Sequence, residues 1–153
     1  MSNKEIANAF DQLAKIMELH NENPFKIRSY QNAYLTLRKL DTPLADFGME
    51  QLMEIKGIGE AIAEKIQSLV KTGSMPTLEK YLAKTPPGVV EMLKINGLGP
   101  KKVATLWHEH GFASPGELLY ACNENRLIEL KGFGEKTQSA IIKAIGFLQS
   151  SEG

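Results

Sequence analysis

The sequence has 153 residues, of which 42% are hydrophobic, so it can bury a core in one domain or in two small ones. Its 18 basic and 18 acidic residues give a formal net charge of zero, which argues against nucleic-acid binding through the field of the whole molecule and leaves only local clusters of cations. The single cysteine, Cys122, excludes an intramolecular disulfide, and apolar runs too short for a membrane span or a signal peptide predict a cytoplasmic protein.

Apolar residues recur at helical spacing along nearly the whole chain, and no segment alternates for long enough to predict a strand. The chain is therefore predicted to be all-α, with helices over 3–20, 24–40, 49–54, 60–72, 76–83, 88–94, 100–111, from 115, and 135–149. The second of these is expected to bury Phe25 and Ile27. The break Thr85-Pro86-Pro87-Gly88 ends any helix and predicts a boundary between two small helical subdomains, 1–84 and 85–153.

Three short strings repeat one pattern, an apolar lead-in followed by Gly-apolar-Gly: Ile55–Gly59, Ile95–Gly99 and Leu130–Gly134. Each lies between two predicted helices, where a tight turn needs the positive φ that glycine adopts without strain. The middle residues are expected to plug the space between the helices: Ile58, Leu98 and Phe133. Exposed backbone N–H groups at such a turn suit a phosphate, so three turns on one small protein predict a polyphosphate partner, most simply DNA.

Other interpretations of these glycines explain less of the pattern. A single Gly-x-Gly is also ordinary turn chemistry between helices. A dinucleotide-binding motif needs a third glycine, whose place is taken here by Ile62, Lys102 and Thr137, and no Gly-Lys-Ser/Thr of a phosphate-binding loop follows. Positive charge gathers beside the turns on Lys56, Lys94, Lys101, Lys102, Lys131 and Lys136. Three copies in one register therefore favour nucleic-acid binding.

The repeated units resemble the helix-hairpin-helix motif of DNA repair and replication proteins. The stretches Phe25–Ala33 and Leu52–Tyr81 resemble the N-terminal lyase domain of family X DNA polymerases, with close matches over Gly57–Ile66, Thr72-Gly73 and Leu78–Lys80. The region around the second turn is similar to the fingers subdomain that follows in those enzymes. The resemblance covers nearly the whole chain. It implies the N-terminal region of a bacterial member, with two small all-α subdomains that carry three helix-hairpin-helix motifs.

Residue by residue, the resemblance implies functional positions. Lys65 falls on the lysine that forms a Schiff base with 5′-deoxyribose phosphate. Phe25, Lys26 and Tyr30 fall on a stacking ring, a lysine that binds the 5′-phosphate and a tyrosine of the same pocket. The hairpin residues that would bind DNA are Gly57, Ile58, Gly59, Gly97, Leu98, Gly99, Lys101, Lys102, Gly132, Phe133, Gly134 and Lys136. A monovalent cation, Na⁺ or K⁺, would be held when DNA is bound by the carbonyl groups of Met53, Ile55, Ile58, Leu93, Ile95 and Leu98.

Some residues depart from the family pattern or allow two roles. Ala61 and Thr77 stand where relatives with strong lyase activity carry basic residues, which weakens the predicted 5′-phosphate pocket. Gln138 stands where the first two units have Ala63 and Val103, so the third hairpin is expected to pack less closely. Phe133 fits either a plug between helices or a base-stacking ring.

The leading hypothesis is sequence-nonspecific binding of gapped or nicked DNA with a 5′-phosphate end, as the N-terminal part of a family X DNA polymerase acting in DNA repair. The alternatives are a 5′-deoxyribose-phosphate lyase that uses Lys65 in base-excision repair, and a protein-interaction module with sterile hairpins. Two-metal polymerase chemistry needs clustered carboxylates, and no Asp-x-Asp pair occurs. A divalent metal is therefore expected only in a polymerase core outside this chain. No small-molecule cofactor and no membrane partner are expected.

Overall fold

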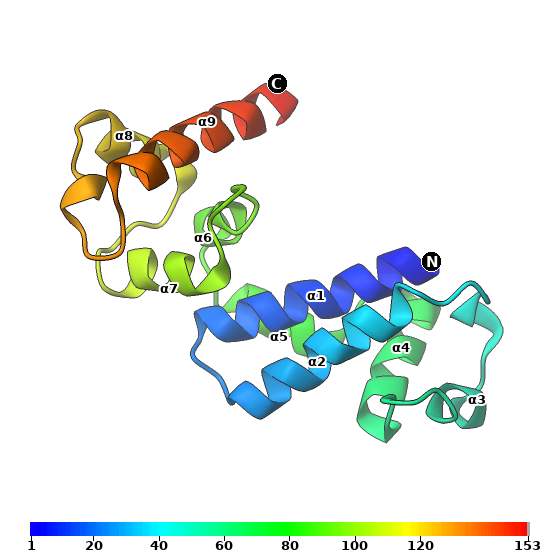
Figure 1. The fold of residues 1–153 in the computed structure, drawn as a ribbon. Helices are drawn as coiled ribbons and strands as arrows, with labels where there is room; N and C mark the ends of the chain where they lie inside the picture. Colours follow the sequence, from blue (N-terminus) through cyan, green and yellow to red (C-terminus); the bar gives the residue numbers. More distant parts are fainter. Residues whose placement is uncertain (153) are drawn as a thin grey trace. The chain divides into compact units, whose positions relative to one another are not determined.

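The computed structural model describes residues 1–152, and the side chains of residues 1–150. This part of the chain is helical and contains no strand, as the sequence predicts: its elements are α1 (Asn3–Leu19), α2 (Pro24–Leu37), the 3₁₀ helix η1 (Leu44–Asp46), α3 (Met49–Met53), α4 (Glu60–Thr72), α5 (Pro76–Ala83), α6 (Pro87–Met92), α7 (Pro100–His108), α8 (Pro115–Asn123), the 3₁₀ helix η2 (Leu127–Glu129) and α9 (Glu135–Glu152). The chain divides into two compact units, Met1–Lys84 and Thr85–Gly153 (Figure 1). No helix of the described part combines the length and the apolar character that a membrane span requires.

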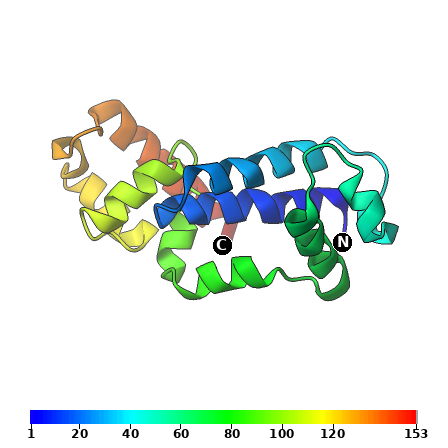
Figure 2. The ribbon, with the colours of Figure 1, turned by 90° about the horizontal axis from the view of Figure 1, so that it is seen from below.

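In the first unit, α1 is the central helix, and α2 lies along it (Figures 1 and 2). Ser2 begins α1 with a capping box, in which its hydroxyl accepts a hydrogen bond from the Glu5 N–H and its own N–H donates to the Glu5 carboxylate, both at 3.1 Å. The buried residues of α1 are Ile6, Ala7, Phe10, Leu13, Ala14, Ile16, Met17 and Leu19. Phe10 stacks on Tyr30 of α2 with ring centroids 6.1 Å apart. This contact orients the tyrosine that the resemblance places in the 5′-phosphate pocket.

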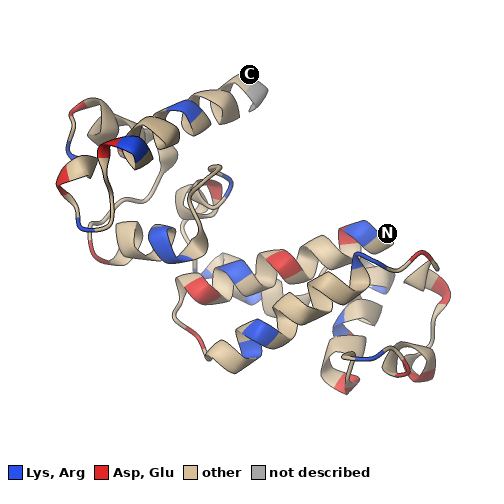
Figure 3. Cartoon of the chain, in the orientation of Figure 1, with Lys and Arg blue, Asp and Glu red and all other residues tan. Residues whose placement is uncertain are grey.

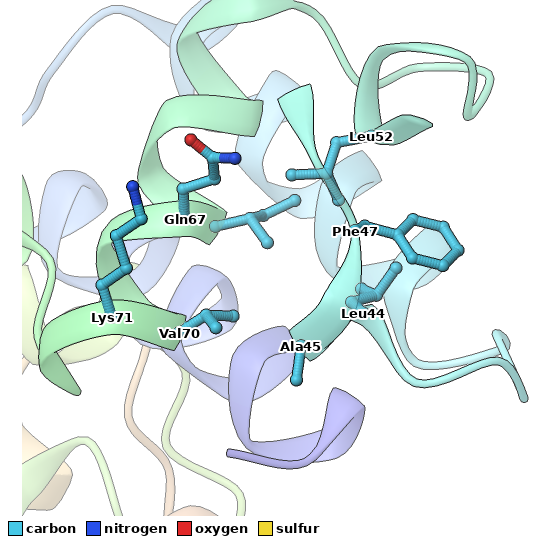
Figure 4. Close-up of a pocket in the computed structure, with 8 residues that line it drawn as sticks. Leu44, Ala45, Phe47, Leu52, Gln67, Val70 and Lys71 are labelled. Carbon is cyan, nitrogen blue, oxygen red and sulfur yellow. The ribbon is translucent and has the colours of Figure 1, made fainter. Parts of the chain in front are cut away.

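Asn3 ties the connection after α2 to the start of α1. Its Nδ2 donates to the carbonyl oxygens of Leu40 at 3.1 Å and Thr42 at 2.8 Å, and its Oδ1 accepts from the Leu44 N–H at 3.0 Å. With α3 and α4, the connection closes a small apolar pocket of about 100 Å³ (Figure 4), lined by Leu44, Ala45, Phe47, Leu52, Ile66, Gln67, Val70 and Lys71. The first hairpin is therefore packed on a loop that a single side chain holds against α1.

In the second unit, α8 packs against α9, and α6 contacts both α7 and α8. Ser114 begins α8, since its hydroxyl accepts from the Glu117 N–H at 3.2 Å and the Glu117 carboxylate accepts from the Ala113 N–H at 2.7 Å. The apolar core of this unit includes Val89, Met92, Leu98, Val103, Leu106, Leu118, Leu127, Ile141 and Ile145. This core holds the second and third hairpins in one unit.

Gly88 lies where α6 passes the connection that precedes α8. A Cβ atom at this position would overlap the carbonyl oxygen of Ala113 and would stand 2.9 Å from Cβ of Ser114. Only a residue without a side chain allows so close an approach of two backbones. The sequence predicts Gly88 as part of a helix break, and the structure adds a packing role.

Phe25 is 79% exposed, so the expectation that the second helix buries it is wrong. The buried residues of α2 are Ile27, Tyr30, Ala33 and Leu37, which recur every three or four positions. Phe25 belongs to the opposite side of the helix, because each residue advances the helix by about 100°. The ring is therefore available to a ligand.

Two predicted helices run three residues past their observed ends. The second helix ends at Leu37, because the N–H groups of Lys39 and Leu40 bond to carbonyl groups three residues back and tighten the last turn. The helix predicted over 100–111 ends at His108, and Gly111 closes it with φ +74° while its N–H donates to the Trp107 carbonyl group at 3.1 Å. Gly111 thus terminates the helix although it lies beyond the last helical residue.

Candidate nucleic-acid interface

The three glycine turns have the same backbone geometry. The first glycine has positive φ in each, +90° at Gly57, +84° at Gly97 and +89° at Gly132, as the sequence predicts. The residue after it donates its N–H to the carbonyl group three positions back: Ile58 to Ile55 at 3.0 Å, Leu98 to Ile95 at 3.1 Å and Phe133 to Leu130 at 3.1 Å. The third turn is entered from the 3₁₀ helix η2 rather than from an α-helix. The sequence repeat is therefore a repeat of one structural unit.

The second glycine of each turn starts the following helix. The carbonyl groups of Gly59, Gly99 and Gly134 accept the first helical hydrogen bonds at 2.9, 3.0 and 2.9 Å. Side chains of Ser2, Asn23 and Ser114 cap α1, α2 and α8, whereas no side chain in the described part of the chain caps α4, α5, α6 or α7. What distinguishes α4 and α7 is that each follows an exposed glycine turn, where the N–H groups of the first helical turn suit an anion. In α7 these N–H groups begin at Lys101, because Pro100 has none.

The apolar residues between the glycines are buried, as predicted for plugs. Their exposed fractions are 3% for Ile58, 4% for Leu98 and 6% for Phe133. The burial of Phe133 favours the plug over the base-stacking ring, because a stacking ring must present its face to solvent. Any DNA contact of these three residues is thus made by their backbone.

The charges at the three turns differ. The first turn of α7 holds Lys101 and Lys102, both exposed, and no acidic residue. The first residues of α4 and α9 are instead Glu60 and Glu135, and acidic and basic residues lie side by side at the start of α9 (Figure 3). Acidic residues stabilise a helix N-terminus, whereas lysines there oppose the helix dipole. Lys101 and Lys102 therefore lower the stability of α7 and increase the attraction of the second hairpin for an anion.

The third hairpin holds a buried polar side chain. Gln138 is 5% exposed, and its Nε2 donates to Oδ1 of Asn125 at 3.0 Å. Asn125 follows α8 with φ +57°. The hydrogen bond joins the first turn of α9 to Asn125 beyond the end of α8. The Oε1 atom of Gln138 is buried without a hydrogen-bond partner among the described residues, so the polar side chain is only partly satisfied at this hairpin.

The residues of the predicted lyase pocket lie on α2, α4 and α5. Lys65 of α4 is half-buried, and its Nζ stands 5.7 Å from the centre of the Tyr30 ring, so the structure brings these two together. Phe25 and Lys26 are exposed in the first turn of α2, where Asn23 accepts from the Phe25 N–H at 2.8 Å.

Tyr81 of α5 is coupled to this pocket. Burial, and then the nearby Glu22 carboxylate that its hydroxyl hydrogen-bonds, raise the pKa of Tyr81 above its ordinary value, and Tyr30 adds to the shift. Tyr81 therefore stays protonated at neutral pH. Ala61 and Thr77, which replace basic residues of the family pattern, leave Lys26 and Lys65 as the cations that the resemblance assigns to this region.

The predicted cation sites at the first two turns would use backbone carbonyl groups. The oxygens of Ile55 and Ile95 each accept one hydrogen bond within the turn, and a carbonyl oxygen keeps a second lone pair. Uncharged carbonyl oxygens are donors that suit Na⁺ and K⁺. A monovalent cation at these turns stays a prediction. Within residues 1–152, no group of three or more His, Cys, Asp or Glu residues could hold a metal ion.

Two residues of α9 that the sequence analysis does not single out are Lys143 and Phe147. Both are exposed, and Phe147 is 76% exposed. The signal in the sequence is an aromatic residue off the buried stripe of α9, which runs through Gln138, Ile141 and Ile145. A single exposed aromatic ring is ordinary on a protein surface, so Phe147 gains meaning only from the residues that lie around it.

The two glycines of the second turn separate folding from binding. Gly97→Ala places a side chain at φ +84° and is expected to destabilise the second unit by about 1–2 kcal/mol. Gly99 has φ −79°, and a Cβ there meets no atom within 4 Å, so Gly99→Ala is expected to lose only about 0.5 kcal/mol. The added methyl group would lie at the start of α7, where it would weaken DNA binding more than it weakens folding. Urea unfolding measures the loss of stability in each variant, and DNA titration measures the loss of affinity. The same ratio of lost affinity to lost stability in Gly97→Ala and Gly99→Ala would contradict this prediction.

Comparison with known proteins agrees with this geometry. A family model described as a helix-hairpin-helix domain matches residues 1–75, and one described as a SAM-like helix-hairpin-helix tandem matches residues 89–146. The DNA polymerase/3′-5′ exonuclease PolX of Bacillus subtilis (strain 168) is 34% identical over 146 residues, which are 95% of this chain and 25% of the relative. The chain thus spans a quarter of the length of that relative. It belongs to the helix-hairpin-helix proteins, and it is homologous over nearly its whole length to the N-terminal part of a family X DNA polymerase.

Proposed function

We propose that this chain binds gapped or nicked DNA without sequence preference, as the N-terminal part of a family X DNA polymerase that acts in DNA repair. The observation that carries the proposal is the threefold turn, with the N-termini of α4 and α7 uncapped by any described side chain and facing solvent. Such a site recognises phosphate, and phosphate contacts position DNA without reading its sequence.

The two units would share this work. The first unit, with the first hairpin and with Lys26 and Phe25 exposed in the first turn of α2, would hold the 5′-phosphate at the downstream side of a gap. The second hairpin, with Lys101 and Lys102, would hold the upstream strand. A monovalent cation on the carbonyl groups at each turn would neutralise part of the phosphate charge when DNA is bound.

Titration with labelled gapped duplexes tests the proposal. The chain is expected to bind a gapped duplex with a 5′-phosphate more tightly than the same duplex with a 5′-hydroxyl, and Lys26→Gln is expected to remove that preference. Lys39→Gln, an exposed lysine beyond α2, is the matched control and is expected to keep it. Failure to bind any of these DNAs at low ionic strength would contradict the proposal and favour a protein-interaction module.

A second candidate, 5′-deoxyribose-phosphate lyase activity, is favoured by the half-buried position of Lys65 beside Tyr30. Schiff-base formation needs the neutral amine, however, and a neighbouring cation favours that form. Ala61 and Glu60 add no cation at the start of α4. The structure therefore supports DNA binding better than catalysis.

Borohydride trapping on incised abasic DNA separates the two activities. We expect little covalent adduct, and the same small amount from wild type, Lys65→Ala and Lys71→Ala, since Lys71 is an exposed lysine of the same helix. An abundant adduct that Lys65→Ala abolishes and Lys71→Ala retains would overturn this expectation and establish Lys65 as the nucleophile.

A further inference from the structure

A groove in the second unit joins the second glycine turn to α9. It is shallow and largely open to solvent, with a volume of about 570 Å³. Asn96 and Gly97 of the turn form one wall, and Ala140, Lys143, Ala144 and Phe147 of α9 form the other. The groove therefore begins at the place where the proposed function puts a DNA phosphate.

The wall from α9 is a second face of that helix. Ala140, Lys143, Ala144 and Phe147 recur at helical spacing and lie apart from the buried stripe that packs into the core. The two alanines leave room above the helix, and the Phe147 ring is 76% exposed. This face is thus open, apolar and bounded by an aromatic ring.

The chemistry of the groove fits a nucleotide. Its lining holds one cation, Lys143, and no acidic residue, which complements a phosphate. An exposed aromatic ring stacks on bases of any sequence, but only on bases that are not already stacked in a duplex. The groove is also continuous with the hairpin whose first helical turn carries Lys101 and Lys102.

We propose that this groove binds one unpaired nucleotide next to the phosphate held by the second hairpin. Lys143 contacts the neighbouring phosphate, and Phe147 stacks on the base. The proposal rests on the proposed function, because it needs DNA at the second turn. It would explain why the chain prefers a gapped duplex over an intact one, because phosphate contacts alone do not distinguish the two.

The test compares a gapped duplex with the sealed duplex of the same sequence at one salt concentration. Phe147→Ala is expected to weaken binding of the gapped duplex about fivefold or more and to leave the sealed duplex unchanged, since only the gap offers a free base. Phe147→Trp is expected to restore gapped binding. Lys143→Gln is expected to weaken both. Tyr120→Ala removes another exposed ring of the same unit, 60% exposed and outside the groove, and is expected to change neither.

The outcomes separate this proposal from the proposed function. If Lys101→Gln/Lys102→Gln weakens binding but Phe147→Ala does not, or if Phe147→Ala weakens both duplexes equally, the groove does not take an unpaired base and the proposal is overturned while DNA binding stands. If wild type binds neither duplex, the proposed function itself fails. Self-association that Phe147→Ala abolishes would assign the groove to a second copy of the chain and would also overturn the proposal.

Discussion

The double variant Lys101→Gln/Lys102→Gln is expected to bind gapped DNA about tenfold more weakly than wild type at physiological salt. The slope of log K against log salt is expected to become less negative by about two. Each lysine removed from a phosphate contact lowers the number of counterions released from the DNA by about one. Its thermal stability is expected to stay level or rise, because the two lysines oppose the dipole of α7. A loss of binding with a gain in stability cannot come from unfolding.

Lys4→Gln/Lys39→Gln is the matched control for the double variant. Both lysines are exposed and lie in the first unit, outside the three turns, and the change in net charge is the same. The control is expected to change affinity and slope little. Equal losses in the two double variants would mean that net charge, and not the second hairpin, holds the DNA.

Gly88→Ala is expected to destabilise the second unit by about 3 kcal/mol, the upper range for overpacking. The added methyl group would overlap the backbone of Ala113, so α6 or the connection before α8 must move. The sole tryptophan, Trp107, lies in α7, and its fluorescence therefore reports unfolding of this unit alone. Urea titration followed at Trp107 measures the change.

The same substitution elsewhere in the unit should have the opposite sign. Gly146 lies on the exposed side of α9, and a Cβ there meets no atom within 4 Å. Gly146→Ala is expected to stabilise the unit by about 0.5–1 kcal/mol through helix propensity. Equal stability of Gly88→Ala and wild type would show that the close approach of α6 to Ala113 is not a constraint.

The parts of this structure that could be predicted are those in which local chemistry leaves few choices. Gly57, Gly97 and Gly132 reach positive φ because a tight turn between helices demands it. The prolines after Thr85 interrupt helix, and the two compact units meet there. The plug residues are buried because each of these apolar side chains fills the space between the two helices that its turn connects.

The parts that could not be predicted depend on contacts distant in sequence. Gly88 reads as a helix break, since nothing near it in sequence signals the backbone of Ala113. Asn3 is unremarkable in sequence and yet holds the loop at Leu44. The groove beside Phe147 exists only because α9 passes the second turn. Contacts of this kind can be identified only from the three-dimensional structure.

The most direct test of the central claim is the salt dependence of DNA binding by the wild-type chain. If Lys26, Lys101, Lys102 and Lys143 each neutralise one phosphate, log K for gapped DNA is expected to fall linearly with log salt with a slope of about −3 to −4, of which the second hairpin supplies about two. The formal net charge of zero leaves no general attraction of the whole chain to add to this slope. An affinity that does not change with salt would contradict the account, because it would mean that the lysines at and near the glycine turns do not contact DNA phosphates.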